Sequence, residues 1–423
     1  MIQNSEYKET PIGRIPKEWE VVRLGDEKIA EIRGNKTINK FERVAFIPME
    51  LVPDSGIFAR YEIRSMKEVK SFTYCERGDL LLAKITPSLE NGKQGIVPEG
   101  VPNGFALATT EVFPISCKKS IDKLFLFYIL KFTKFRNKII HSMIGTTGRQ
   151  RASKDSIKNL KIPLPPLPEQ KKIAEILSTV DKAIETVDSA IAETEKLKKG
   201  MMQELLSKGI GHKEFKDTKI GRIPKEWEVV RLSDISLGFI GGGTPSTLNP
   251  NYWNGDIAWM TSAHINGRVI TNGQKYITKK GLENSATNII PKDNLLVATR
   301  VGIGKTAINK IDIAISQDLT GVIIDKNKSI PDFLYWYITN NKRKLKYLAQ
   351  GSTIKGILKK ELGRLKIPLP PLPEQKKIAE ILSTVDKKLE LERERKKKLE
   401  RIKKGLMNDL LTGKRRVKVD AIH

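Results

Sequence analysis

LKIPLPPLPEQKKIAEILSTVDK fills residues 160–182, and the same run returns at residues 365–387. A second stretch, IGRIPKEWEVVRL, occupies both 12–24 and 220–232. Identical runs of this length do not arise by chance, and internal repetition marks a duplicated structural unit. The segments between the runs are similar in length but share few residues. The chain therefore consists of two copies of one framework around two inserts that have diverged.

The proline-rich part of the repeat predicts how each long helix begins. Alternating proline and apolar residues over 162–168 favour an extended chain, and Pro168 and Glu169 suit the first turn of a helix. Apolar residues then recur at alternating steps of four and three, the heptad spacing of a coiled coil. The predicted seam contains Ile173, Leu177, Val180, Ile184, Val187 and Ile191 in one helix, and Ile378, Leu382, Val385, Leu389, Leu399 and Leu406 in the other.

A polar helix with so narrow an apolar stripe needs a partner along that stripe. The simplest partner is the other copy, which predicts an antiparallel coiled coil with an internal pseudo-twofold axis. At 1.5 Å per residue, helices of about 40 residues would each be about 60 Å long. The alternative is that each helix packs on its own domain. Identical starts and matched lengths favour the pair.

The two inserts keep weak similarities in the same order. Short apolar runs at 80–83 and 295–298 predict buried strands, and the aromatic segments 124–129 and 333–338 predict helices packed on a sheet. Such aromatic residues belong more often to a core than to a base-stacking surface. The sequence thus predicts an α+β chain with two similar mixed α/β domains. Its segments are domain 1 (1–160), lead-in and helix 1 (161–212), domain 2 (213–365), and lead-in, helix 2 and basic tail (366–423).

The chain of 423 residues has a net charge of +27, which favours a polyanionic partner. Most of the excess belongs to the domains, because 1–160 carry +8 and 213–365 carry +11. The first helix segment is neutral, whereas 366–423 carry +8, largely in the run 393–404 and the tail. A solvated helix face is an equally good interpretation of that run.

Two basic domains held apart by a spacer predict a two-site reader of double-stranded DNA. Lysine side chains would neutralise phosphates, while Arg, Asn and Gln can form paired hydrogen bonds with base edges. The candidates are the polar residues of the predicted loops. They are Lys84, Lys93, Arg149, Gln150 and Arg151 in the first domain, and His264, Asn266, Arg268, Arg300, Lys305 and Lys355 in the second.

Motifs for catalysis or cofactors are weak. Gly302-Ile303-Gly304-Lys305-Thr306 resembles the end of a P-loop, but Thr299 stands where the first glycine belongs. Pro53-Asp54 with Glu68-Val69-Lys70 fits a loose nuclease spacing and is more simply explained as a turn. Neither a methyl-donor fingerprint nor a histidine cluster for a metal is found, so we expect a non-catalytic binder without cofactor or metal. Two cysteines and no apolar leader or span favour a cytoplasmic protein.

Taken together, these segments resemble the DNA-specificity subunits of type I restriction-modification systems. The resemblance covers nearly the whole chain and rests on the two repeats, on Arg300-Val301-Gly302-Ile303-Gly304-Lys305 and on Ile315-Ser316-Gln317-Asp318-Leu319. The first domain departs from it by having 84–93 and 108–112 in place of the last two segments.

The resemblance implies two target recognition domains, each recognising half of an asymmetric, two-part DNA site. It also implies that the helices set the gap between the halves. Such subunits recruit two copies of a DNA adenine methyltransferase, together with restriction/translocase subunits. The methyl donor, ATP and Mg²⁺ are then expected on those partners.

Two other classes of protein stay open on the residues alone. One is a self-contained restriction or methylation enzyme, which the missing catalytic motifs disfavour. The other is a coiled-coil scaffold whose basic domains bind RNA or proteins. A preference for particular duplex DNA sequences would distinguish the specificity subunit from both.

Overall fold

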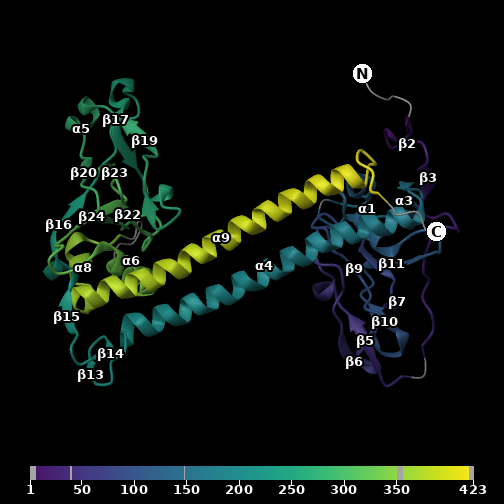
Figure 1. The fold of residues 1–423 in the computed structure, drawn as a ribbon, viewed down its shortest axis with the longest axis horizontal. Helices are drawn as coiled ribbons and strands as arrows, with labels where there is room; N and C mark the ends of the chain where they lie inside the picture. Colours follow the sequence, from purple (N-terminus) through teal and green to yellow (C-terminus); the bar gives the residue numbers. More distant parts are fainter. Residues whose placement is uncertain (1–5, 39–40, 147, 350–355, 419–423) are drawn as a thin grey trace. The chain divides into compact units, whose positions relative to one another are not determined.

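The computed structural model describes residues 6–38, 41–146, 148–349 and 356–418 (Figure 1). Its contacts divide the chain into two compact units, unit 1 with residues 1–189 and 393–423, and unit 2 with residues 190–392. Both long helices, α4 (Leu167–Lys208) and α9 (Leu372–Leu410), contribute to both units. Each unit therefore holds one domain, the beginning of one long helix and the end of the other. Within the described ranges, no helix has the length and hydropathy needed to cross a bilayer.

The domain of unit 1 is built on two four-stranded sheets. One sheet has the order β6-β5-β10-β7 and the other β4-β11-β8-β9. Within the first sheet, β5 and β10 are parallel, and the other pairings are antiparallel. The bounds are β4 Ala30–Ile32, β5 Arg43–Ile47, β6 Glu62–Ser65, β7 Thr73–Glu76, β8 Leu80–Ala83, β9 Gln94–Ile96, β10 Phe105–Ala108 and β11 Val112–Cys117.

The domain of unit 2 repeats this strand order. Its sheet β16-β24-β21-β22-β18 has the order of β4-β11-β8-β9 with one strand added. Its other sheet, β19-β17-β23-β20, has the order of β6-β5-β10-β7, and the central pair β17-β23 is parallel, as β5-β10 is. The bounds are β16 Ser236–Gly241, β17 Trp253–Met260, β18 Val269–Ile270, β19 Lys275–Ile277, β20 Asn288–Ile290, β21 Asn294–Ala298, β22 Thr306–Asn309, β23 Ile313–Ile315 and β24 Leu319–Ile324. The predicted similarity of the two domains is confirmed.

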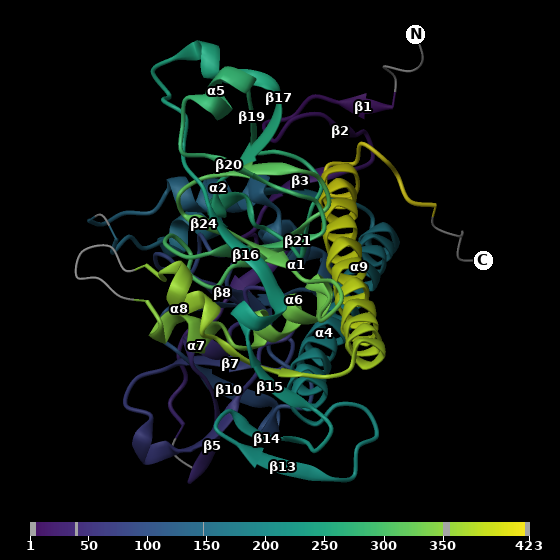
Figure 2. The ribbon, with the colours of Figure 1, turned by 90° about the vertical axis from the view of Figure 1, so that its left-hand side faces the viewer.

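Short helices cover the sheets and complete each core. Unit 1 has α1 Lys123–Lys131, α2 Thr133–His141 and α3 Lys154–Lys158, and unit 2 has α5 Lys279–Glu283, α6 Pro331–Asn340, α7 Lys342–Tyr347 and α8 Lys359–Gly363. The apolar runs predicted as strands form the fully buried β8 and β21. The aromatic residues of α1 and α6 are also buried in the cores, as predicted. In unit 2, α5, β17 and β19 lie at the end opposite the hairpin of β13 and β14 (Figures 1 and 2).

The repeated segments build the same frame beside each domain. Two-residue strands β1 (Tyr7–Lys8) and β2 (Ile15–Pro16) pair in unit 1, as β13 (Phe215–Thr218) and β14 (Gly221–Pro224) do in unit 2. Each proline-rich lead-in forms a strand rather than a free polyproline segment. β12 (Lys161–Leu164) pairs with β3 (Glu20–Arg23), and β25 (Lys366–Leu369) pairs with β15 (Glu228–Arg231). Proline is tolerated because a two-stranded ribbon leaves its missing N–H on an open edge.

The long helices pack antiparallel within each unit. In unit 1 the ammonium groups of Lys396 and Lys403 lie 2.6 and 2.5 Å from the carboxylates of Asp188 and Asp181. In unit 2 Lys198 pairs with Asp386. As positions rise along α4 they fall along α9, which is the antiparallel direction predicted for the two copies of the helix. Every predicted seam residue is buried or half-buried.

A glutamate carboxylate, buried in Glu169 and partly exposed in Glu374, fixes the first turn of each long helix. Glu169 accepts a 3.0 Å hydrogen bond from the indole N–H of Trp19, and Arg416 of the tail binds the same carboxylate at 2.7 and 3.0 Å. Glu374 accepts one from Trp227 at 3.0 Å, and the imidazole Nε2 of His212 lies 2.9 Å away. The identical runs of sequence therefore make the same tryptophan–glutamate contact in both units.

Candidate nucleic-acid interface

Four of the five residues predicted to contact DNA in the first domain meet on two paired loops. The amide of Ala152 donates to the carbonyl of Lys84 at 2.8 Å, and the amide of Thr86 donates to that of Gln150 at 3.0 Å. Ile144 and Arg151 exchange backbone hydrogen bonds of 3.0 and 2.9 Å, which closes the second loop. The loops that bear Lys84 and residues 149–151 are therefore held as one surface.

The charged side chains of this surface have different freedom. Arg149 is exposed. Arg151 donates to both carboxylate oxygens of Glu111, at 2.8 and 2.9 Å, so its guanidinium is already partly engaged. Lys84 lies over the ring of Phe113, and burial, with Arg151 nearby, lowers its pKa below the usual lysine value. Arg149 is thus the most available cation of this group.

Lys93 is held inside the domain. Its ammonium group donates to the carbonyls of Met49 and Val52, both at 2.9 Å. Binding a phosphate would require breaking both hydrogen bonds. Lys93 therefore connects the segment after β5 to β9 and is not part of the proposed interface.

In the second domain, Asp318 joins the two loops that carry most candidates. Its side chain accepts from the amide of Ser262 at 2.8 Å, and its carbonyl accepts from Thr299 at 2.9 Å. This places the loop with His264 and Asn266 beside the loop with Arg300 and Lys305. Asn266, Arg300 and Lys305 are exposed, whereas the half-buried His264 has its Nε2 3.3 Å from the carbonyl of Asn272.

Arg268 faces an acidic groove rather than this surface. Its guanidinium forms an ion pair with Asp332 at the start of α6. The groove, about 470 Å³, is lined on the α9 side by three carboxylates, those of Glu380, Asp386 and Glu390. Because Arg268 is paired with Asp332 and faces this groove, it is not part of the proposed interface. Lys355 lies outside the described residues.

Apolar residues at the tips of the two surfaces escaped the sequence-based prediction. Ile144 and Val301 are 76% and 65% exposed, and each lies next to or opposite a candidate arginine. An exposed aliphatic group beside an arginine can contact the methyl group of thymine while the arginine binds guanine. Isolated surface apolar residues are common in proteins, and no pattern in the sequence distinguishes these two.

A second feature missed from the sequence is a group of lysines where each domain meets the long helices. In unit 1, Lys131 and Lys134 on α1 and α2 line a groove of about 560 Å³ with Lys403 and Lys404 of α9. In unit 2, Lys342 of α7 lies in the electrostatic field of Lys198, Lys305 and Lys346. The basic run 393–404 was the available signal, but a solvated helix face explained it equally well.

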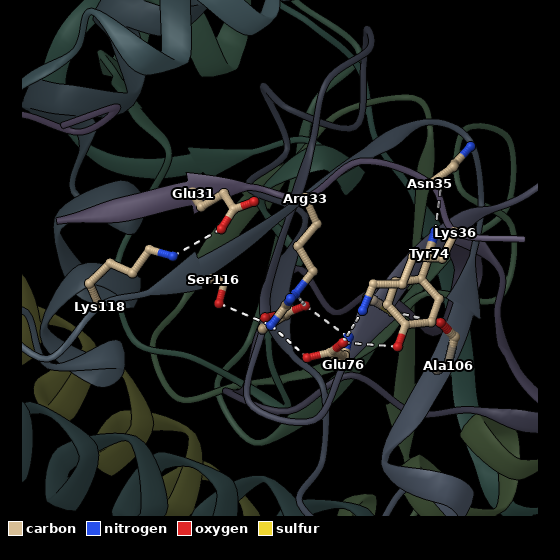
Figure 3. Close-up of polar contacts among 11 residues, drawn as sticks. Glu31, Arg33, Asn35, Lys36, Tyr74, Glu76, Ala106, Ser116 and Lys118 are labelled. Carbon is tan, nitrogen blue, oxygen red and sulfur yellow. Dashed lines mark hydrogen bonds and ion pairs between the residues drawn. The ribbon is translucent and has the colours of Figure 1, made fainter. Parts of the chain in front are cut away.

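A polar network around Arg33 in unit 1 is closed on itself (Figure 3). Arg33, which follows β4, binds Glu76 at 2.8 Å, Asp79 at 2.5 Å and the hydroxyl of Ser116 at 3.0 Å. Tyr74 donates its hydroxyl to Glu76 at 2.9 Å. Burial raises the pKa of Asp79 although Arg33 opposes the shift. Since every charge has its partner inside the network, its function is to join the two sheets of the domain.

Neither weak catalytic motif has supporting geometry. The amides of Gly304 and Lys305 donate within their own turn, to Ala298 and Gly302 at 3.1 and 3.0 Å, so they do not form a phosphate cradle. Over the described ranges, no three His, Cys, Asp or Glu side chains are grouped to hold a metal, and this includes Asp54 and Glu68. The geometry offers two loop surfaces and lysine groups, which suit binding of a polyanion.

Known proteins share both the sequence and the fold. The family of type I restriction modification DNA specificity domains matches residues 16–196 and 224–401. A putative type I restriction enzyme MjaX specificity subunit from Methanocaldococcus jannaschii is 33% identical over 98% of each chain. The MjaVIII specificity subunit of the same organism is 33% identical over 98% of this chain and 97% of its own.

A solved structure agrees with the fold. The S subunit of a type I restriction-modification system from M. genitalium superposes with a TM-score of 0.60 at 15% identity, covering 97% of this chain and 98% of that chain. The likeness to that structure concerns the fold alone, while the family match covers both halves of the sequence. The chain belongs to the DNA-specificity (S) subunits of type I restriction-modification systems.

Proposed function

We propose that each domain of this chain recognises one half of an asymmetric, two-part DNA sequence and that the long helices set the gap between the halves. As an S subunit, the chain defines the DNA target of its complex and is neither the catalytic subunit nor a cofactor carrier. One observation carries the two-half proposal. The two domains share a strand order but bear different loop residues, on frames with identical sequence.

The first half-site would be recognised by the surface around Arg149, with Lys84, Gln150 and Arg151. The second would be recognised by Asn266, Arg300 and Lys305, with His264 beside them. Arginine, asparagine and glutamine supply paired hydrogen bonds to base edges, and the lysines supply phosphate contacts. Different side chains on equivalent loops imply different half-sites, hence an asymmetric target.

The duplicated frame supports a pair of identical partners. Two equivalent surfaces made of the same residues suit two copies of one protein. We therefore propose that the chain binds two copies of a DNA adenine methyltransferase, and through the complex the restriction and translocase subunits. The methyl donor, ATP and Mg²⁺ would reside on those partners. Because the target is cellular DNA and both cysteines are free thiols, a cytoplasmic location is part of the proposal.

Mapping methylated adenines tests the proposal directly. DNA from cells that express this chain with its neighbouring methyltransferase should carry a two-part methylated sequence with a fixed gap, absent from cells that express the methyltransferase alone. A single continuous sequence would contradict the two-half proposal. Methylation without any sequence preference would instead favour a scaffold that holds the enzyme on DNA. Methyl transfer or cleavage by the purified chain alone would favour a self-contained enzyme.

A further inference from the structure

We propose that the lysine group at the junction between each domain and the long helices is a binding site for backbone phosphates of DNA, separate from the loops that would recognise bases. The junction groove of unit 1 is formed by the end of α1, the start of α2 and the last turns of α9. The junction group of unit 2 consists of Lys198, Lys342 and Lys346, and Lys305 of the neighbouring loop adds its charge to it. The inference rests on the proposed function, since it assumes that the chain binds duplex DNA.

Positive charge in the junction groove of unit 1 lacks a matching anion. Four of its ten lining residues are lysines, and Glu400 is the one carboxylate among them. Lys403 is paired with Asp181 at 2.5 Å, whereas Lys134 and Lys404 are exposed. Among the residues that the structure describes, no carboxylate lies within ion-pair distance of Lys134 or Lys404. An anion of the size of a phosphate would be held by these two side chains at the rim.

A cation deeper in the groove adds to this field. The ammonium group of Lys131 donates to the carbonyls of Gly92, at 2.9 Å, and Asp54. Burial, with Arg136 and Lys403 nearby, lowers the pKa of Lys131 to about 7. Cations gathered in this way weaken one another's charged states, and a bound anion would relieve the repulsion. Arg136 is itself buried and fixed by the carbonyls of Leu130 and Leu89, both at 3.0 Å.

Unit 2 builds the same arrangement from different residues. Lys198 of α4 occupies the repeat position of Lys403, pairs with Asp386 as Lys403 pairs with Asp181, and lies over an aromatic ring of the domain, as Lys403 does. Burial, together with Lys198, Lys305 and Lys346, lowers the pKa of Lys342. The short helices α2 and α7 share almost no sequence, yet both bring lysines to the junction. Two diverged domains have thus kept the charge but not the residues around it.

The place of these lysines favours DNA over an acidic protein. In unit 1, Lys131 and Arg136 bind the carbonyls of Gly92 and Leu89, in the same loop that begins with Lys84. In unit 2, Gly304 is a close neighbour of Lys342, because a methyl group in place of its hydrogen would lie 3.4 Å from the Cγ of Lys342. Helix α7 therefore lies against the loop of Arg300 and Lys305. A duplex whose bases meet these loops would bring its neighbouring phosphates to the lysine groups.

Two double variants of the full chain test the proposal. K134Q/K404Q removes the exposed cations of the junction groove in unit 1, and K342Q/K346Q does so in unit 2. K119Q/K398Q is the matched control, because it removes two exposed lysines of unit 1 that do not line the groove. All three change exposed side chains, so folding should persist. Binding to random and target duplexes would be measured from 50 to 200 mM salt.

The affinity for DNA falls as salt rises, and each lost phosphate contact makes the slope of log affinity against log salt less steep by about 0.9. The slope of each junction variant should therefore be less steep than that of the control by about 2. Its binding to random and to target duplexes should be weaker by the same factor, about tenfold at low salt. Slopes equal to the control would overturn the proposal, and an accompanying loss of methyltransferase binding would assign the groove to a protein partner. Failure of the unmodified chain to bind any duplex would instead contradict the proposed function itself.

Discussion

Glu169 and Glu374 occupy the same repeat position but contact different basic side chains. The carboxylate of Glu169 is 3% exposed and is bound by Trp19 and Arg416, whereas Glu374 is bound by Trp227 and His212. Arg416 lies in the tail that follows α9, and His212 lies in the segment that follows α4. The tail of the chain therefore supplies the basic partner of the glutamate in unit 1, and the connecting segment supplies it in unit 2. A buried carboxylate needs such a partner because its charge is otherwise uncompensated.

Replacing Arg416 by alanine should destabilise unit 1. Glu169 would keep Trp19 but lose its charge partner, and since Arg416 is 40% exposed we expect a loss of about 2 kcal/mol rather than the full value for a buried pair. Urea unfolding would measure the loss, and hydrogen exchange should place it in residues 12–24 and 167–173. R415A is the control, because Arg415 is 80% exposed and touches only Asp409 among the described carboxylates. Equal unfolding of both variants would contradict the role of Arg416.

Arg149 and Arg300 should each determine bases of one half-site. R149A is expected to relax the sequence preference of one half, and R300A that of the other, by about 1–3 kcal/mol of discrimination at one base pair. R268A should leave both preferences intact, because Arg268 is paired with Asp332 away from the loops. Binding to duplexes changed one base pair at a time measures the effect. A uniform loss over all sequences would reassign either arginine to phosphate binding.

Lys131 should give DNA binding a specific dependence on pH. Its pKa of about 7 means that it is mostly neutral at pH 8 and mostly charged at pH 6. If phosphates bind the junction groove, affinity should rise as pH falls through 7, and K131Q should lack that part of the rise, about threefold. The groups that face it are Arg136, Lys403, Asp54 and Asp181, with Lys134, Glu400 and Lys404 along the groove. K398Q should keep the profile of the unmodified chain, and matching profiles for K131Q and K398Q would contradict the prediction.

At the residue scale, the sequence predicted the candidate loops better than the orientation of single side chains. Arg149, Arg300 and Lys305 are exposed on the predicted loops. Lys93 and Arg268 are turned away, to the carbonyls near residue 50 and to Asp332. These partners lie more than 40 residues away along the chain, and no local pattern encodes such contacts. The junction lysines were missed for the same reason, since α2 meets α9 only in the folded unit.

At the scale of elements, heptad spacing predicted the two long helices, and the duplication of the chain predicted that they pair in antiparallel direction. The seam positions Ile173, Leu177, Ile378 and Leu382 are almost fully buried, because the domain cores close over the helix starts. Farther along the helices buried and half-buried positions alternate, since Val187 and Leu389 are buried and Ile184 and Ile191 are half-buried. Lysine–aspartate pairs supplement the seam there. The strand formed by each proline-rich lead-in was not predicted, because its partner is the distant β3 or β15.

Shortening both long helices by one heptad should shorten the unread gap. Removing 184–190 and 389–395 keeps the seam in phase and lies between the lysine–aspartate pairs that flank it, Asp181 with Lys403 and Lys198 with Asp386. Seven residues at 1.5 Å correspond to about three base pairs at 3.4 Å. Adenine methylation mapping should find both half-sites unchanged and the gap reduced by about three. An unchanged gap would show that the helices do not set it, and a variant with the same residues replaced by another heptad controls for the change in sequence.

On the scale of the whole molecule, duplication gives each domain the same packing surface on the long helices. Domain 1 packs on Ile173, Ala174 and Leu177 with Met407 and Leu411, and domain 2 packs on Ile378, Ala379 and Leu382 with Met202 and Leu206. These are the same residue types at matching repeat positions. A domain is therefore held by a constant surface, while its loops are free to diverge. Such a constant surface is compatible with the proposal that the two domains recognise different half-sites.

The identical packing surfaces predict that the second domain can replace the first. The flanks match up to Leu24 and Leu232 and again from Leu160 and Leu365, so residues 233–364 can be inserted in place of 25–159 without changing the frame. Asp181 and Lys403 remain paired with each other, because both lie in the frame. The graft replaces Tyr128, which lies under Lys403, by Trp336, which lies under Lys198 in unit 2. If the pseudo-twofold axis predicted from the sequence relates the two identical domains, the methylated sequence should become an inverted repeat of a single half-site with the original gap. Retention of the asymmetric sequence, in a graft that folds and still binds its methyltransferase, would mean that the frame and not the inserted domain chooses the bases.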